Sequence, residues 1–156
     1  MQRRTLMAAS TTVLAFPALA QLQSMAPQVH AALAPNPAEF RKAMADFTQG
    51  RKPQTEGLLL DVPTLADNPA AVPVKVKVTL PITQQDWCEE IIVLADLNPT
   101  PLACRLQFTA AAGTAEAAVR VRLSQSQTVH ALARMKSGKL LAASHAVTVA
   151  ASGCGM

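Results

Sequence analysis

Apolar and polar residues alternate with a period of two through much of the chain after Gly50. The clearest stretch is residues 72–80. Its even positions hold Val72, Val74, Val76, Val78 and Leu80, and Lys75, Lys77 and Thr79 lie between them. Strict alternation over this length predicts a strand that buries one face and exposes the other.

Further strands are predicted from runs that alternate or stay apolar over a short length. Residues 57–61 and 90–96 are short apolar runs, residues 104–109, 119–124 and 129–135 alternate, and a last stretch covers 139–143 and continues to Val149. Turn residues, Asn98-Pro99-Thr100-Pro101 and Ser137-Gly138, separate some of these runs. About seven short strands separated by turns predict an antiparallel β-sandwich.

One segment, residues 37–48, has the helical period instead. Asn36 is a good N-cap, Pro37 suits the first helical position, and Glu39 can reach back to the cap. A single apolar stripe follows, made by Phe40, Ala43, Met44 and Phe47. Gly50 is the expected stop. The sequence therefore predicts one N-terminal helix beside the sandwich.

Residues 1–20 resemble an export signal. Arg3 and Arg4 precede an uncharged apolar stretch, and Ala18-Leu19-Ala20 is a site that a signal peptidase accepts. The paired arginines favour a twin-arginine signal over an ordinary secretion signal. Four parts follow: a removable leader at 1–20, a tether at 21–36, a helix-plus-sandwich domain at 37–150 and a cysteine arm at 151–156. We expect a soluble periplasmic protein with no membrane segment once the signal is removed.

Composition narrows the possible functions. The 156 residues suit one domain, and the net charge of +4 includes Arg3 and Arg4 of the leader. Without them 12 basic residues face 10 acidic ones, and aromatics are 3% of the chain, so a nucleic-acid partner is not expected. The outward lysines and arginines fit a solvated sheet face better than a polyanion site.

Catalytic and metal-binding motifs are not apparent. His30, His130 and His145 are scattered, with no spacing typical of a metal site, and there is no phosphate loop, nucleophile elbow or close carboxylate pair. We therefore expect no metal, no cofactor and no enzymatic activity of the chain's own.

The cysteine arm carries the candidate chemistry. Ser152-Gly153-Cys154-Gly155-Met156 follows the last predicted strand, and the small residues Ser152, Gly153 and Gly155 leave the thiol of Cys154 accessible. Neither a histidine nor a carboxylate side chain is adjacent, so the thiol is expected to act as a covalent handle, not as a hydrolase nucleophile. An incidental thiol or an intermolecular disulfide remain alternatives.

The other two cysteines are interpreted from the predicted strands. If residues 90–97 and 102–109 form a hairpin, Cys104 lies opposite a residue near 95 and far from Cys88, so only a cross-sheet bridge would join them. Cys104 is expected to be a small buried core residue beside Leu106 and Phe108. The pattern leaves the role of Cys88 open.

Several segments, taken in order, resemble the SoxY family, the sulfur-substrate carriers of bacterial thiosulfate oxidation. They are the arginine-paired leader, residues 61–68 leading into Val72-Pro73-Val74, the Asn98–Pro101 turn, residues 120–127 before the Ala131/Ala133 strand, and the final Gly-Cys-Gly. Two glycines of the usual Gly-Gly-Cys-Gly-Gly tail are replaced, by Ser152 and Met156, and Asn68 is followed by Pro69 where Asn-Gly is common.

The resemblance implies an immunoglobulin-like carrier domain with a flexible C-terminal arm. Cys154 would attach substrate covalently: a partner haem enzyme couples it to thiosulfate, a hydrolase releases sulfate, and a persulfide remains. A small sandwich subunit, SoxZ, would complete a heterodimer. The alternative is an exported structural or chaperone-like β-sandwich whose terminal thiol only forms a disulfide.

Overall fold

Eight strands and one α-helix form most of residues 34–150, the part of the chain that the computed structural model describes. In order they are α1 (Pro37–Thr48), β1 (Leu58–Asp61), β2 (Leu65–Ala66), β3 (Val72–Val78), β4 (Cys88–Ala95), β5 (Leu102–Gln107), a 3₁₀ turn η2 (Ala110–Ala112), β6 (Glu116–Val121), β7 (Gln127–Met135) and β8 (Leu140–Val149). The predicted mainly β fold with one helix is confirmed.

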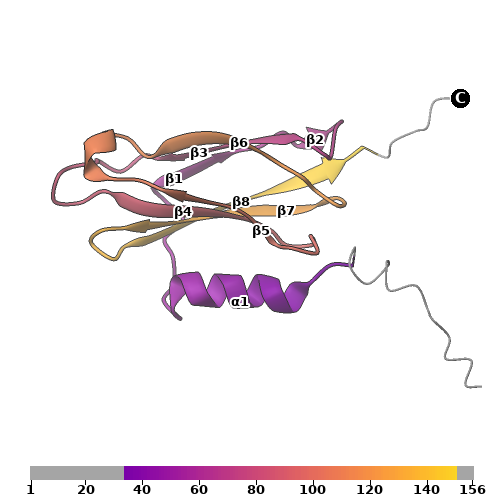
Figure 1. Cartoon of the computed structure of the whole chain (residues 1–156), viewed down its shortest axis with the longest axis horizontal. Coiled ribbons are helices and arrows are strands. Elements are labelled where there is room, and N and C mark those ends of the chain that lie inside the picture. Colours follow the sequence, from indigo (N-terminus) through magenta and orange to yellow (C-terminus); the bar gives the residue numbers. More distant parts are fainter. Residues whose placement is uncertain (1–33, 151–156) are drawn as a thin grey trace, which may run out of the picture.

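The strands form two stacked sheets, and α1 lies against the outer side of the larger one (Figure 1). The smaller sheet has the order β1-β3-β6 and the larger the order β2-β8-β7-β4-β5. Every strand pair is antiparallel except β2 with β8, which is parallel. Strand β2 was not predicted, because two residues are too few to show an alternating pattern.

The space between the sheets holds the main core. Alternate residues of β3 point into it, and Val74 and Val76 are fully buried. Burying one such side chain contributes roughly 1.5–3 kcal/mol. Leu80 was expected in the same strand, but β3 ends at Val78 and Leu80 only packs against the rim of the core.

Strand β4 in the interior of the larger sheet is buried on both faces, which explains why residues 90–96 are apolar without alternating. Ile91 and Val93 face the smaller sheet, whereas Ile92 and Leu94 face α1. On that side the helix contributes the predicted stripe, in which Phe47 is buried and Phe40, Ala43 and Met44 are partly buried.

The helix has the predicted bounds, but the residue that stops it is Gln49, one position before the expected Gly50. Its N-cap Asn36 accepts a hydrogen bond from the Glu39 amide at 3.1 Å and donates one to the Glu39 carboxylate at 2.9 Å. The chain turns at Gln49, which has a left-handed φ of 51°, before reaching Gly50. Within residues 34–150, no helix has the length and apolar character needed to cross a membrane.

Two irregularities in the register redirect side chains of the larger sheet. The β4–β7 register shifts between Cys88 and Glu90, so Cys88 joins Ile91 in the inter-sheet core although it lies three residues away. The β4–β5 register shifts at Val93/Leu94, so Cys104 faces the core but Leu102 faces α1. Bulges of this kind change the face a strand presents.

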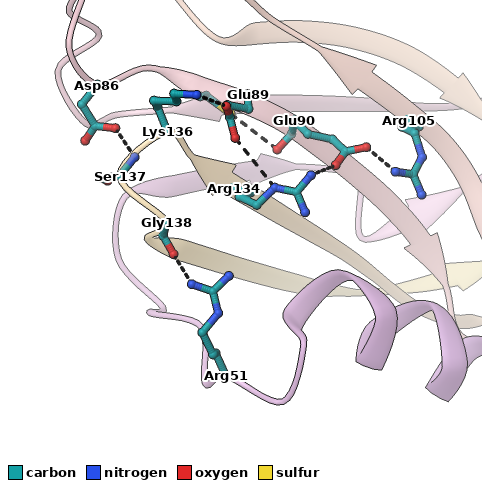
Figure 2. Close-up of polar contacts among 10 residues, drawn as sticks. Arg51, Asp86, Glu89, Glu90, Arg105, Arg134, Lys136, Ser137 and Gly138 are labelled. Carbon is teal, nitrogen blue, oxygen red and sulfur yellow. Dashed lines mark hydrogen bonds and ion pairs between the residues drawn. The ribbon is translucent and has the colours of Figure 1, made fainter.

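A buried carboxylate bridges three strands beneath α1 (Figure 2). Glu90 of β4, whose side chain is 5% exposed, pairs with Arg105 of β5 through one oxygen and with Arg134 of β7 at 2.5 Å through the other. The Arg134 guanidinium also lies 5.1 Å from the centre of the Phe47 ring. The sequence analysis placed residue 90 at the start of an apolar strand and did not foresee this cluster.

Replacing Glu90 by Gln should lower the free energy of unfolding by about 2–3 kcal/mol, because two arginines lose their shared buried carboxylate. Urea denaturation of the purified chain measures this. Glu89→Gln is the matched control, since Glu89 is more exposed and pairs with Lys136 at 3.3 Å and, at 4.0 Å, with the outer edge of Arg134. Its cost should stay within about 0.5 kcal/mol. Equal losses in the two variants would contradict the assigned role of Glu90.

Candidate functional site

The predicted site residues Ser152, Gly153, Cys154 and Gly155 lie outside the described residues, as do the leader and His30. The structure does describe the strand from which they continue. Strand β8 ends at Val149, and Ala150 is the last described residue.

The end of β8 is held along both of its edges. Towards β2, the Thr148 amide donates to the Thr64 carbonyl at 2.8 Å and the Ala150 amide donates to the Ala66 carbonyl at 3.0 Å. Towards β7, the last pair of the ladder is Gln127 with Val147.

Beyond the last β7–β8 pair, a side chain continues the pairing. The Val149 amide donates to the hydroxyl of Ser126 at 2.9 Å. Backbone amides of three successive residues, Thr148 to Ala150, are thus bound on alternate sides.

A buried amide cluster supports the loop that carries Ser126. Asn98, 9% exposed, donates to the Arg122 carbonyl at 2.7 Å. Its oxygen accepts from the Ser124 amide at 2.9 Å and from the Gln127 side chain at 2.8 Å. Gln127 in turn accepts from the Leu97 amide at 2.9 Å. These bonds join the β4–β5 turn to the β6–β7 loop.

Sequence reasoning identified the Asn98 turn but not the burial of its side chain, and it overlooked Ser126, Gln127 and β2. The one local sign of these contacts is the polar run Ser124-Gln125-Ser126-Gln127 between two predicted strands, which contributed to the family resemblance but not to a structural prediction. The partners that tie these side chains to other elements lie 23 to 30 residues away, so spacing alone does not reveal them.

An open groove lies beside this cluster, between the edges of the two sheets. Its volume is about 730 Å³, and its lining includes Pro69, Leu102, Leu123 and the two arginines Arg120 and Arg122. On the outward face of β3, by contrast, Lys75 and Lys77 both pair with Glu116, at 2.7 and 3.2 Å. That face is consistent with the solvated-sheet interpretation.

The two described cysteines are poor candidates for chemistry. Cys88 is fully buried, and burial raises the pKa of its thiol to about 11. Cys104 was expected to be buried but is only half-buried, because β5 is an edge strand; burial also raises its pKa. Both thiols are free, so the cross-sheet bridge considered above does not form. The predicted hairpin is confirmed, with Cys104 opposite Val93.

The two described histidines do not converge on a site. His130 of β7 is opposite Ser144 and His145 of β8 is opposite Val129, so the register places them on opposite faces of the sheet. His130 packs against Phe40 of α1, with ring centres 5.1 Å apart, and lies 3.9 Å from Asp96. Within residues 34–150, no group of three or more potential ligands could hold a metal ion.

The chain matches one protein family by sequence, and solved structures of two kinds of protein have a similar fold. The family described as "Sulfur oxidation protein SoxY" matches residues 44–154, a span that ends at Cys154. The solved structure of the sulfur carrier protein SoxY from Chlorobium limicola f thiosulfatophilum is 21% identical, with a TM-score of 0.59, over 74% of this chain and 100% of that one.

Superoxide reductases have a similar fold. The neelaredoxin of Ignicoccus hospitalis is 17% identical, with a TM-score of 0.54, over 61% of this chain and 81% of that one. A putative superoxide reductase of Thermotoga maritima is 21% identical, with a TM-score of 0.52, over 68% of this chain and 92% of that one. None of the curated proteins matches the sequence.

Alkylation of the native protein should follow the accessibility of the three thiols. Cys154 should react first, Cys104 more slowly and Cys88 only after unfolding, because a buried thiol with a raised pKa is neither accessible nor ionised at neutral pH. Peptide mass mapping after timed treatment with iodoacetamide gives the order. Early modification of Cys88 would contradict its position in the core.

Acid should destabilise the fold through His130. Burial lowers the pKa of His130 in the folded chain, although Asp96 partly offsets this. The unfolded chain then binds more protons than the folded one below pH ~6.5, so stability falls as pH drops from there to the lower folded pKa. The difference in unfolding free energy between the unaltered chain and His130→Gln should shrink across that window. A difference independent of pH would refute this.

Proposed function

The chain belongs to the SoxY family of sulfur oxidation proteins, and on that premise we propose that it carries sulfur intermediates covalently on Cys154 and presents them to partner enzymes. The observation that carries the proposal is the family match over residues 44–154, which ends on the cysteine flanked by Gly153 and Gly155. The similarity of the fold supports the proposal, since the whole chain of the sulfur carrier protein SoxY from Chlorobium limicola f thiosulfatophilum aligns with this one.

The distribution of thiols supports Cys154 as the attachment point. A carrier needs a thiol that several enzymes can reach. The other two cysteines pack inside the sandwich, where Cys88 is fully buried and Cys104 faces the inter-sheet core. Their raised pKa values also leave them less reactive than an ordinary thiol.

The proposed chemistry begins with an oxidative coupling. The Cys154 thiol and the outer sulfur of thiosulfate form a sulfur–sulfur bond, releasing one proton and two electrons, which a partner haem enzyme accepts. The product is a cysteine S-thiosulfonate. A hydrolase then adds water across the bond to the outer sulfonate, releasing sulfate and one proton and leaving a cysteine persulfide. Catalysis in both steps lies with the partners, and the chain is the substrate carrier.

We further propose a periplasmic location and a stable heterodimer with a SoxZ-like subunit. The paired Arg3 and Arg4 of the leader support export. Support for a partner comes from the open edges of the sandwich, since β5 and β6 each have one unpaired side. Edge strands of this length are normally covered, charged or paired.

Substituting Cys154 by Ser should abolish thiosulfate-dependent oxidation in a reconstituted system, because the hydroxyl cannot form the sulfur–sulfur bond. The fold should be unaffected. Cys104→Ser is the control: it removes one thiol as well and should keep full activity.

Intact mass and peptide mapping of protein incubated with thiosulfate and the partner enzymes locate the adduct. It should lie on the peptide that contains Cys154. An adduct on Cys88, or activity retained by Cys154→Ser, would refute the proposal. A thiol that forms only a protein disulfide would favour the structural alternative.

A further inference from the structure

The three internal segments that carry the family resemblance meet at one end of the sandwich. Residues 61–68 contain β2, the Asn98–Pro101 turn contributes Asn98, and residues 120–127 contribute Ser126 and Gln127. Figure 1 shows β2, the β4–β5 turn and the β6–β7 loop gathered where β8 ends. The carrier chemistry proposed above gives none of them a role.

We propose that these segments form a clamp that fixes the root of the cysteine arm at Ala150. The arm-base clamp consists of residues 64–66, Asn98, Ser126 and Gln127. Ser126 and β2 are positioning residues: they determine how far, and from which point, Cys154 can reach. This inference rests on the proposed function, because reach matters only if Cys154 visits partner active sites.

The β2 half of the clamp does little else in the fold. It has two residues, of which Leu65 is 54% exposed and only Ala66 is buried. Val62 just before it is buried in the core, and Asn68 just after it closes a turn by accepting from the Ala70 amide at 3.1 Å. The segment is thus anchored at both ends, and between them the carbonyls of Thr64 and Ala66 accept from the amides of Thr148 and Ala150.

The Ser126 half extends the β7–β8 ladder by one hydrogen bond. A serine in an exposed loop would hold Val149 only weakly if the loop could move. Here the loop is tied to the buried Asn98 through the Ser124 amide and the Gln127 side chain. Val149 is therefore hydrogen-bonded to a loop whose residues on either side of Ser126 are themselves hydrogen-bonded to the β4–β5 turn.

The clamp sets the free length of the arm. From Ala150 to Cys154 is four residues, which span roughly 14 Å when extended. If β8 separated back to Val147, its last residue paired with β7, the free segment would have about seven residues and reach roughly 24 Å. Because effective concentration falls as about the −3/2 power of length, the longer arm would present its thiol roughly two- to threefold less often.

Hydrogen exchange tests the clamp directly. In the full chain, Ser126→Ala should speed exchange of the Val149 amide by about fivefold, the effect of losing one hydrogen bond. Ser126→Thr keeps the hydroxyl and should restore protection. Ser137→Ala is the matched control, since Ser137 is exposed in the β7–β8 turn, at the opposite end of β8 from Val149. Unchanged Val149 exchange in Ser126→Ala overturns the clamp.

A distance measurement tests positioning. Nitroxide labels are placed on Cys154 and on Cys introduced at the exposed position Gln107, in a Cys104→Ser background. The distance distribution should broaden in Ser126→Ala/Thr148→Pro/Ala150→Pro, which removes all three hydrogen bonds to the end of β8, and stay unchanged in Ser137→Ala. A distribution of the triple variant identical to that of the unaltered chain overturns the positioning role.

A transfer assay separates this inference from the proposed function. The variant Ser126→Ala/Thr148→Pro/Ala150→Pro removes all three hydrogen bonds that hold the end of β8. It should lower thiosulfate-dependent turnover two- to threefold while the rate of Cys154 alkylation by iodoacetamide stays the same. Unchanged turnover overturns the positioning role. If the unaltered chain itself carries no sulfur, the proposed function fails, and so does the role of the clamp in sulfur transfer, whereas the exchange measurement still decides whether the clamp exists.

Discussion

Burial of β4 on both faces is the constraint on which the rest of the structure depends. One face packs on the smaller sheet and the other on α1, so β4 is apolar on both sides from Ile91 to Ala95. A sandwich with one solvated outer face would not need the helix. The position of α1, the apolar run in β4 and the two register shifts all follow from filling two cores with one sheet.

Two buried polar side chains, Glu90 and Asn98, lie near opposite ends of the sandwich. Glu90 lies between the sheet and α1 and is neutralised by Arg105 and Arg134, which come from the strands on either side of it. Asn98 lies at the end where β8 terminates and is satisfied by a loop carbonyl, a loop amide and the Gln127 side chain. Neither side chain has an unpaired polar atom, which buried polar groups require.

Strand β8 connects the stability of the core to the proposed carrier role. Its first half is buried between β7 and the segment at Gln54, and its last residues are held by β2 and Ser126. On the proposed function, this strand is the part of the sandwich from which Cys154 is presented. The fold is similar to that of superoxide reductases, and a shared fold does not by itself imply a shared function.

The sequence by itself determined α1, seven of the eight strands, the β4–β5 hairpin and the candidate thiol Cys154, because periodicity, caps and turn residues are local properties. Only the tertiary structure decided that Cys88 is the more buried cysteine, that β2 pairs with β8, and that Glu90 and Asn98 are buried. Each of these depends on a bulge or on partners distant in the chain. A bulge changes the face that a side chain occupies, and a hydrogen bond between remote segments leaves no periodic trace in the sequence.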